Sequence, residues 1–283
     1  MTDKIIIKLK GGLGNQIFQF AAAYGATKAT GAKLLLDVSY YDLDSRHGGC
    51  LIQHIFPLPP QSFIKITGIP ESFIYLYTDG NPSDFIPHIY QKTSNIVLSG
   101  YFQNWKYIEN VLSDLKNLYN LKINEYSGKN FTASLEKIKF NKDKLKIGVH
   151  IRRGDYTNKS ISHIHGLINF DTIINTANKY IEEINQITIL EKWIFTDDKN
   201  LIAPKGWLIF PTFANKVAGD ILTFIAMSQC DYIVCSNSTY SYTASLLGRS
   251  KITMLPSQWM KNNQIKTNDL IGSNMIIYDA NCE

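Results

Sequence analysis

Short apolar runs alternate with amphipathic stretches along this chain, and glycine or polar residues mark the transitions. Lys4 to Leu9 is almost continuously apolar, which is typical of a buried strand in a parallel sheet. After a glycine turn, Asn15 to Thr30 has the pattern of a helix that ends at Gly31, and Ala32 to Leu36 is a second apolar run. This order predicts a βαβ unit with a parallel sheet and a right-handed crossover.

The same alternation returns in the second half of the chain. The predicted strands there are Lys146–Ile151, Lys192–Thr196, Trp207–Phe210, Tyr232–Cys235 and, as the last one, Lys251–Leu255; the predicted helices are Phe170–Ile184, Gly219–Ser228 and Thr239–Leu247. Residues 40–130 lack a clean period, and only a strand at Val97–Tyr101 and a helix at Tyr107–Leu118 are predicted within them. The expected organisation is two α/β domains, residues 1–140 and 141–283.

Composition is consistent with this organisation. With 283 residues, 45% of them hydrophobic, the chain can bury one large core or two ordinary ones. Its net charge of +5 suits a small polyanionic ligand and does not indicate a nucleic-acid binder. Four cysteines are too few for a disulfide framework, so Cys230 and Cys235 are expected to be buried thiols. The N-terminus does not resemble a signal peptide, and a cytoplasmic location is expected.

The run from His150 to Asp155 carries the most informative chemistry. It follows a predicted strand, so Arg152 and Arg153 would lie where that strand ends, which is where open α/β sheets bind ligands. Alternation along the strand places His150 and Arg152 on one face. A guanidinium offers a planar fork of donors that suits phosphate. The alternative is an Arg–Asp salt bridge, but two arginines near one carboxylate leave cationic capacity for an anion. His163 and His165 follow this run in a polar loop and are interpreted as surface residues.

A glycine-rich turn from Gly11 to Asn15 connects the first strand to the first helix. Gly12 and Gly14 would let a ligand approach the helix N-terminus closely. The turn partly matches a dinucleotide fingerprint, because Asp37 ends the second strand where a ribose-binding carboxylate belongs. The third glycine of that fingerprint is absent, since position 17 is Ile17. A tight turn without a ligand is the alternative.

Two further polar segments follow predicted strands. Asn237, Ser238 and Thr239 precede a helix, where the dipole and backbone N–H groups can hold a diphosphate, although a simple N-cap is an equal alternative. Asp197 and Asp198 could accept hydrogen bonds from a ribose or a guanine, or could cap the turn. A lone pair of aspartates is weak evidence for a divalent cation, so no metal is expected.

Several motifs occur in a fixed order: Gly11–Gln16 with Phe18–Ala21, Gly100–Gln103, His150–Tyr156, Thr196–Asp198 and Ser236–Thr239. Together they resemble the α-1,2-fucosyltransferases of glycosyltransferase family 11. The resemblance implies a GT-B-like fold of two facing Rossmann-type α/β domains. It also implies metal-independent, inverting transfer of L-fucose from GDP-fucose to the 2-hydroxyl of a galactoside. The stretch Tyr240–Thr243 departs from the family, whose members often have Phe-Ser-Trp-Trp there, and this departure concerns packing and acceptor choice.

The resemblance also assigns roles by position. Arg152 would hold the β-phosphate of the leaving GDP, and Asn15 would lie near the reacting oxygen. The expected donor-binding residues are Gly12, Gly14, Arg152, Arg153, Asp197, Asn237, Ser238 and Thr239. His150 and Asp155 both stay open as the base that takes the acceptor proton. The expected acceptor-binding residues, on the N-terminal side, are Asp37, Tyr101, Gln103 and Trp105.

Two other functions fit parts of the sequence. The glycine turn with Asp37 would suit a nicotinamide-dependent oxidoreductase, and the aromatic-rich middle segment would suit a non-catalytic glycan-binding protein. The expected partners are GDP-fucose and a galactose-containing acceptor glycan, and no nucleic acid. A lipid-linked acceptor would bring the enzyme to the inner face of the membrane without an anchor. The sequence specifies neither the acceptor nor the oligomeric state.

Overall fold

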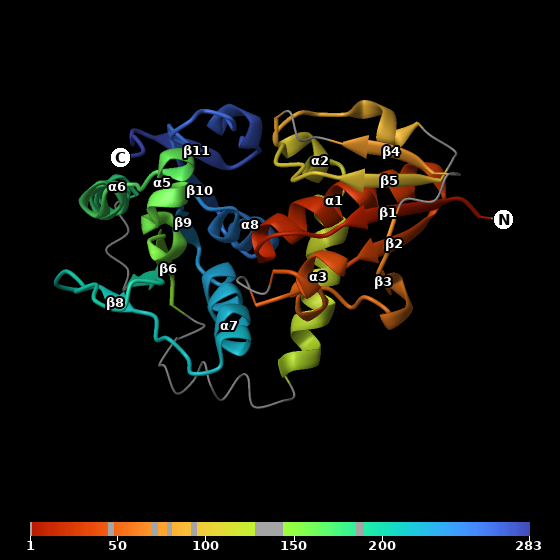
Figure 1. The fold of residues 1–283 in the computed structure, drawn as a ribbon. Coiled ribbons are helices and arrows are strands. Elements are labelled where there is room, and N and C mark those ends of the chain that lie inside the picture. Colours follow the sequence, from red (N-terminus) through yellow and green to blue (C-terminus); the bar gives the residue numbers. More distant parts are fainter. Residues whose placement is uncertain are drawn as a thin grey trace. The chain divides into compact units, whose positions relative to one another are not determined.

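The computed structural model describes residues 2–44, 48–68, 73–77, 81–91, 95–127, 144–184 and 190–283. The chain divides into two compact units, Met1–Ile123 (unit 1) and Asn124–Glu283 (unit 2), each built around its own sheet (Figure 1). The expected domain boundary after residue 140 lies outside the described residues.

Unit 1 contains a parallel sheet with the strand order β3-β2-β1-β5-β4. Its strands are β1 (Lys4–Lys8), β2 (Lys33–Asp37), β3 (Phe63–Ile64), β4 (Ile74–Tyr77) and β5 (Ile96–Ser99). Its helices are α1 (Leu13–Thr30), α2 (Trp105–Glu109) and α3 (Leu112–Ser127), which continues across the unit boundary. The chain order reverses between β1 and β5, so the turns that follow these two strands meet at one edge, where α/β sheets bind ligands.

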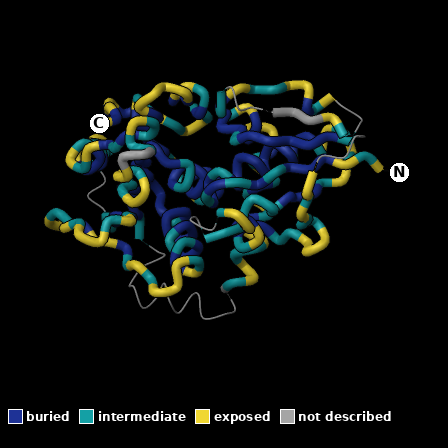
Figure 2. The backbone as a smooth tube through the Cα atoms, in the orientation of Figure 1, coloured by how far each residue is buried: buried dark blue, intermediate teal, exposed yellow. Residues whose placement is uncertain are grey.

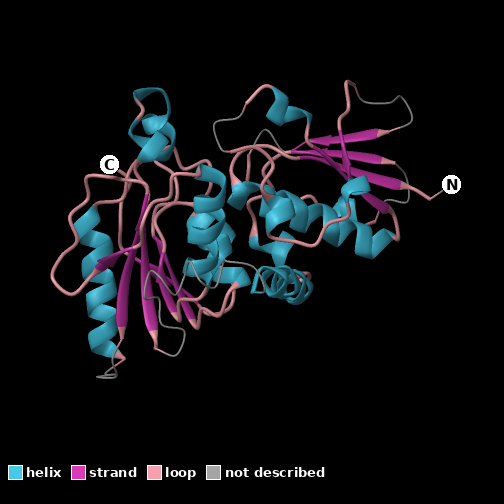
Figure 3. Cartoon of the chain, turned by 90° about the horizontal axis from the view of Figure 1, so that it is seen from below, coloured by secondary structure: helices cyan, strands magenta, loops and turns pink. Residues whose placement is uncertain are grey.

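Unit 2 contains a parallel sheet with the order β11-β10-β9-β6-β7-β8 and helices on both of its faces (Figure 3). Its strands are β6 (Lys146–Ile151), β7 (Glu191–Thr196), β8 (Leu208–Ile209), β9 (Tyr232–Val234), β10 (Ile252–Pro256) and β11 (Met275–Tyr278). Its helices are α5 (Lys159–His165), α6 (Phe170–Glu183), α7 (Lys216–Ser228) and α8 (Thr239–Leu247). All residues of the central strand β6 are buried, and the chain order reverses between β6 and β9.

Short 3-10 helices complete the described elements: η1 (Ser39–Asp42), η2 (Ile52–His54), η3 (Pro60–Ser62), η4 (Pro87–Tyr90), η5 (Gly154–Thr157) and η6 (Thr267–Leu270). The exposed surface lies mainly on turns and loops, whereas the inner strands and the inner helix faces are buried (Figure 2); the edge strands β8 and β11 also expose residues. All four cysteines are free, and Cys230 and Cys235 are buried, as expected.

The structure corrects three of the expected elements. Lys251–Leu255 was expected to hold the last strand, but β11 follows it at the sheet edge. The polar loop expected around His163 and His165 is the helix α5. The single helix expected at Tyr107–Leu118 is two helices, α2 and α3, separated at Asn110. No helix in the described ranges is long and apolar enough to span a bilayer.

Candidate functional site

Two carboxylates hold Arg152 at the carboxyl end of β6. Asp155 forms an ion pair with Nη2 of Arg152, and Oδ2 of Asp197 lies 2.7 Å from Nη1. Asp197 directly follows β7, and the strand register places Thr196 opposite Ile151, so the residues after these two strands are neighbours. The Arg152 side chain keeps 27% of its surface exposed and can therefore be reached by a ligand.

The carboxylate of Asp197 also fixes the backbone that follows Arg152. Its Oδ1 atom accepts hydrogen bonds from the backbone N–H groups of Arg153 at 2.7 Å and Gly154 at 3.1 Å. Gly154 has a φ of 20°, and a Cβ atom there would overlap Oδ2 of Asp197. Glycine is thus required for Asp197 to approach, and Asp197 acts as a brace for the loop that carries Arg152.

The expectation of spare cationic capacity at this arginine pair is wrong, because the sequence argument counted only one nearby carboxylate. Burial lowers the pKa of Arg152, but the charges of Asp197 and Asp155 more than offset it, so that this pKa is raised. Arg153 donates from Nη1 to the carbonyl oxygens of Arg152 at 3.1 Å and Ile168 at 3.0 Å. The salt-bridge alternative is therefore present, and an anion would have to share Arg152 with carboxylates.

His150 lies inside unit 2, with 5% of its surface exposed. Its Nδ1 atom is 3.0 Å from the hydroxyl oxygen of Ser236, which follows β9. Burial, and secondarily the charge of Arg152, lowers the pKa of His150 to about 3. A general base works best with a pKa near the operating pH, so this environment argues against His150 as the base. Ser236 had not been singled out by the sequence as a partner of His150.

Tyr156 connects the loop that follows β6 and carries Arg152, called the arginine loop, to the segment that precedes α8. Its hydroxyl donates to the carbonyl oxygen of Asn237 at 3.3 Å, and its ring stacks on His165 at a centroid distance of 4.4 Å. The guanidinium carbon of Arg152 lies 5.3 Å from the Tyr156 ring centroid. Burial raises the pKa of Tyr156 to about 12. Tyr156 appeared in the sequence motif without a role, and His165 was interpreted as a surface residue.

The segment before α8 contains a buried amide with one unsatisfied atom. Nδ2 of Asn237 donates to the carbonyl oxygens of His165 at 2.9 Å and Gly166 at 3.2 Å. Its Oδ1 atom is buried and has no hydrogen-bond partner among the described residues. Ser238 is the N-cap residue of α8, which was the alternative to diphosphate binding, but its side chain makes no capping hydrogen bond, and Thr239 begins the helix. The N-terminus of α8 thus lies at the strand end next to that of Arg152.

In unit 1, a buried glutamine holds the glycine turn in place. Nε2 of Gln16 donates to the carbonyl oxygens of Gly11 and Gly49, both at 3.0 Å, and its Oε1 atom accepts from the N–H groups of Leu51 and Ile52. Gly11, with a φ of 74°, is the position that needs glycine. The expectation had named other glycines of the turn instead.

Gly12 and Gly14, the two glycines named for donor binding, have different places in the turn. Gly12 is the N-cap of α1 in an extended conformation, and Gly14 lies buried in the first helical turn. The helix begins at Leu13, which is two residues earlier than expected, so that Asn15 belongs to its first turn. Neither glycine has a backbone conformation that excludes other residues.

The side chains expected to contact the acceptor do not all have the same surroundings. Nε2 of Gln103 donates to Oδ1 of Asn15 at 2.9 Å, so the structure brings these two residues together. Tyr101 is half-buried with Nζ of Lys10 4.6 Å from its ring centroid, and Trp105 is half-buried at the start of α2. These three positions follow β5, next to the glycine turn that follows β1.

Asp37 is buried, with 1% of its surface exposed, and this argues against a direct contact with an acceptor. Its Oδ1 atom accepts from the N–H groups of Ser39 at 3.0 Å and Ile66 at 3.2 Å. Its Oδ2 atom has no hydrogen-bond partner among the described residues. The visible role of Asp37 is therefore to hold the turns that follow β2 and β3.

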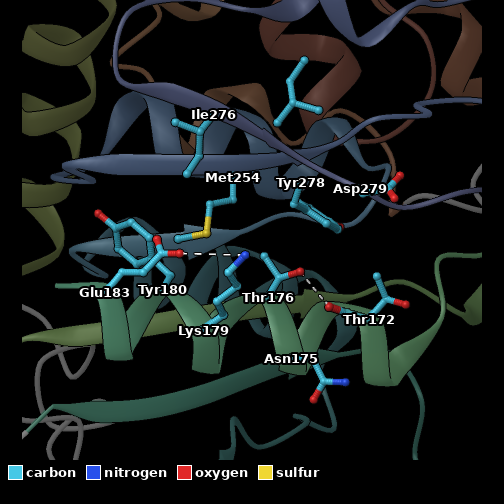
Figure 4. Close-up of a pocket in the computed structure, with 11 residues that line it drawn as sticks. Thr172, Asn175, Thr176, Lys179, Tyr180, Glu183, Met254, Ile276, Tyr278 and Asp279 are labelled. Atoms are coloured by element: carbon cyan, nitrogen blue, oxygen red, sulfur yellow. Dashed lines mark hydrogen bonds and ion pairs between the residues drawn. The ribbon is translucent and has the colours of Figure 1, made fainter. Parts of the chain in front are cut away.

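A separate cavity of about 550 Å³ lies between α6 and the edge strand β11, and it contains none of the residues discussed above (Figure 4). Along its helical wall, the hydroxyl of Thr176 donates to the carbonyl oxygen of Thr172 at 2.8 Å, and Nζ of Lys179 lies 4.0 Å from Oε1 of Glu183. Its polar groups are thus partly satisfied by one another. Within the described ranges, no three His, Cys, Asp or Glu side chains are grouped to hold a metal ion.

Parallel α/β sheets with a guanidinium and a helix N-terminus at one switch point are typical of enzymes that bind phosphorylated ligands. The comparisons with known proteins identify the family within this class. The model of glycosyl transferase family 11 matches residues 90–276. The chain therefore belongs to glycosyltransferase family 11, as its motifs indicated.

Relatives of known name cover most of the chain. The α-1,2-colitosyltransferase of Escherichia coli is 25% identical over an alignment of 295 positions, which covers 94% of this chain and 95% of that protein. The O-antigen biosynthesis glycosyltransferase WbnK of Escherichia coli is 27% identical over an alignment of 293 positions, which covers 90% of this chain and 94% of that protein. A galactoside 2-α-L-fucosyltransferase of Caenorhabditis elegans is 29% identical over an alignment of 163 positions, which covers 54% of this chain and 43% of that protein.

A solved structure supports the fold. The crystal structure of the NodZ α-1,6-fucosyltransferase co-crystallised with GDP has a TM-score of 0.54 and 14% identity, and the match covers 88% of this chain and 93% of that one. With the two parallel α/β units of this chain, the expected GT-B-like fold class is confirmed.

Proposed function

We propose that this chain transfers L-fucose from GDP-fucose to the 2-hydroxyl of a galactose unit in an oligosaccharide or lipid-linked glycan. Membership of glycosyltransferase family 11 supports the transfer of a glycosyl group. Two of the relatives are named for 1,2-linked products, one of colitose and one of fucose on a galactoside, and these names support the linkage. The GDP in the NodZ crystal supports the nucleotide.

The observation that carries the proposal is the placement of Arg152 at the switch point of unit 2. It lies at the end of β6, and the N-terminus of α8 follows the adjacent strand β9. A guanidinium and a helix dipole at one sheet edge are suited to a diphosphate. The unsatisfied Oδ1 atom of Asn237 is suited to accept from an N–H or hydroxyl group of the same nucleotide.

The reaction is a single displacement with inversion at the anomeric carbon. The 2-oxygen of the acceptor bonds to C1 of fucose while the bond from C1 to the β-phosphate oxygen breaks, and its electron pair leaves with GDP. Arg152 donates hydrogen bonds to the β-phosphate as its charge grows, in the role that a metal ion has in other enzymes. The acceptor proton goes to a base on the side of the sugar opposite the diphosphate; His150 is buried, and Asp155 contacts the guanidinium that holds the phosphate, so neither residue is singled out for this role.

The donor has to compete with carboxylates for Arg152. A guanidinium has five N–H donors, and the contacts to Asp155 and Asp197 involve only its two terminal nitrogens. Asp197 is tied to two backbone N–H groups as well, whereas Asp155 is the more exposed partner. The β-phosphate therefore displaces Asp155, and Asp197 keeps the loop in place. In unit 1, Asn15 with its partner Gln103 contacts the acceptor near the reacting oxygen.

The test is the release of GDP from GDP-fucose in the presence of a panel of galactosides, with the linkage of the product determined by NMR. Arg152→Ala should lower turnover by about 10²–10³-fold, and Arg152→Lys should not restore it because the planar fork is lost. Arg249→Lys is a matched control, since Arg249 is also paired with a carboxylate, Asp231 at 2.9 Å, on another part of unit 2. Near-parental turnover of Arg152→Ala would contradict the mechanism.

Two additions to this assay separate the remaining alternatives. Turnover should persist in EDTA, and a loss that Mg²⁺ or Mn²⁺ restores would overturn metal independence. GDP-colitose is the second donor to compare, because one relative is a colitosyltransferase and colitose lacks only the 3-hydroxyl of fucose. GDP, and not NAD, should raise the melting temperature, and the opposite result would favour an oxidoreductase.

A further inference from the structure

Exposed apolar side chains cluster in the segment that leads from β7 into the edge strand β8. This segment, residues 199–209, is called the β8 segment here. It contains Ile202, Leu208 and Ile209, which are 87%, 51% and 36% exposed. Among the described residues these are three of the eight large exposed hydrophobic side chains, although the segment spans only eleven residues. Figure 1 shows the β8 segment extending from the sheet of unit 2, and Figure 2 shows it largely exposed.

The charges of the β8 segment are all positive. Lys199 and Lys205 are exposed, and the sequence from residue 199 to 219 contains no aspartate or glutamate. The next acidic residue, Asp220, is paired with Lys216 at 2.7 Å. Immediately before the segment, the carboxylate of Asp198 accepts a hydrogen bond from the backbone N–H of Asn200 at 2.9 Å. The surface therefore combines large apolar side chains with lysines, and the β8 segment contains no acidic residue of its own.

Buried residues anchor the β8 segment to unit 2. Trp207 and Phe210, on either side of its two strand residues, are buried, and Nζ of Lys192 lies 5.7 Å from the Trp207 ring. Leu208 and Ile209 pair with Trp193 and Ile194 of β7, and β8 has no strand on its other side among the described residues. The exposed apolar side chains are thus held outward by a buried anchor and are not part of the core.

We propose that the β8 segment docks on the surface of a bilayer that contains anionic phospholipids. Ile202 and Leu208 enter the interfacial region, and Lys199 and Lys205 contact the lipid phosphates. Such binding combines apolar burial with electrostatic attraction, and the segment supplies both within a few residues. An acidic protein would also attract the lysines, but the most exposed of the three apolar side chains is an isoleucine, Ile202, on a projecting loop, which suits insertion. The inference goes beyond the proposed function, since bilayer docking requires neither donor nor acceptor.

The test is cosedimentation of the full chain with vesicles of phosphatidylcholine alone or mixed with phosphatidylglycerol. The parent protein should bind the mixed vesicles, bind pure phosphatidylcholine far less, and detach as salt is raised. The double variant Lys199→Ser/Lys205→Ser should lose roughly fivefold in partitioning per lysine removed. Ile202→Ser should lose at least about fivefold through the missing apolar contact.

Matched controls exist in unit 1. Leu43→Ser removes a side chain that is 92% exposed, and Lys4→Ser/Lys33→Ser removes two exposed lysines. Both controls should sediment like the parent, and all variants should keep the parental melting temperature. Absence of parental binding to the mixed vesicles would overturn the proposal, and so would equal losses in the controls. A change of oligomeric state in Ile202→Ser, with vesicle binding intact, would instead assign this surface to self-association.

Discussion

Asp197 holds the arginine loop of unit 2 from three directions. One oxygen receives the N–H groups of Arg153 and Gly154, and the other lies against the guanidinium of Arg152. Asp197, which was expected to contact the nucleotide, therefore uses both of its carboxylate oxygens for contacts within the loop. Asp197 is better described as a positioning residue, because it sets the backbone from which Arg152 projects.

Replacing Gly154 tests this brace. In Gly154→Ala the new methyl group would push Asp197 away from the loop, so we expect GDP affinity to fall by at least about tenfold, equivalent to losing one charge-assisted hydrogen bond. Gly206→Ala is the matched control, because Gly206 also has a positive φ, of 84°, but has open space around it. Isothermal titration with GDP measures the effect. Equal affinities of the two variants would show that the brace does not matter for binding.

His150 should make the protein sensitive to acid. Its pKa is about 3 in the folded chain, mainly because of burial, and about 6.5 when unfolded. Below pH 6.5 the unfolded chain therefore binds the additional proton, and the free energy of unfolding should fall by up to about 1.4 kcal/mol per pH unit down to pH 3. His150→Asn should remove this slope, as measured by urea unfolding at several pH values.

The same replacement at the exposed His163 controls for the loss of a histidine as such. His150→Asn also removes the contact to Ser236, so it lowers stability at neutral pH, and the slope is the quantity to compare. A variant that keeps the parental slope would mean that His150 is not the group that titrates.

At the scale of elements, α1 is unusual in burying two glutamines. Gln16 bonds to the glycine turn and to the residues before η2, and Gln19 bonds to the N–H of Lys10 at 3.1 Å and the carbonyl of Gly100 at 3.1 Å. Both side chains are fully buried. The helix thereby ties together the turns that follow β1 and β5, which carry Asn15 and Gln103.

Replacing Gln16 should therefore lower the free energy of unfolding of the protein and not only disorder the turn locally. Gln16→Met keeps the volume but leaves two buried N–H groups, those of Leu51 and Ile52, without their acceptor, so the free energy of unfolding should fall by at least about 2 kcal/mol. Gln53→Met is the control, because Gln53 is exposed in the same part of unit 1. Urea unfolding monitored by circular dichroism measures both, and equal losses would contradict the argument.

The elements that could be predicted from the sequence are those with a strong pattern of their own. Lys146–Ile151 is continuously apolar apart from Lys146 and His150, and it is the strand β6 as predicted. β3 was not predicted, because it has only two residues and exists only because β2 pairs with it, whereas the predicted strand at Trp207–Phe210 is present as the two residues of β8. β11 was missed because its two central isoleucines are half exposed, so that its pattern is set by the sheet edge.

The candidate site shows the same division. Arg152 and Asn237 could be located because a motif at the end of a strand has a fixed place in a parallel sheet. The side chains that contact the motif residues could not be predicted. The contacts from Arg152 to Asp197 and from His150 to Ser236 join residues far apart in the sequence. The balance of charge around Arg152 was misjudged for this reason, because the second carboxylate, that of Asp197, follows another strand, β7.

At the scale of the whole molecule, each unit has its own switch point with its own chemistry. In unit 2 the strand ends carry a guanidinium and a helix N-terminus, which suit a diphosphate. In unit 1 they carry the amides of Asn15 and Gln103 and the ring of Tyr101, which suit the hydroxyls and faces of a sugar. The proposed function therefore divides the two substrates between the units.

Hydrogen–deuterium exchange tests this division without any assumption about how the units are arranged. GDP should slow exchange at residues 152–154 and 236–241 of unit 2, because a bound diphosphate adds hydrogen bonds and stabilises these turns against opening. A galactoside acceptor should slow exchange at residues 11–16 and 100–103 of unit 1. In Arg152→Ala the effect of GDP should vanish while that of the acceptor persists, which separates a lost contact from a misfolded chain. Protection of the glycine turn by GDP would reverse the assignment, since the nucleotide would then bind to the unit whose turn partly matches a dinucleotide fingerprint.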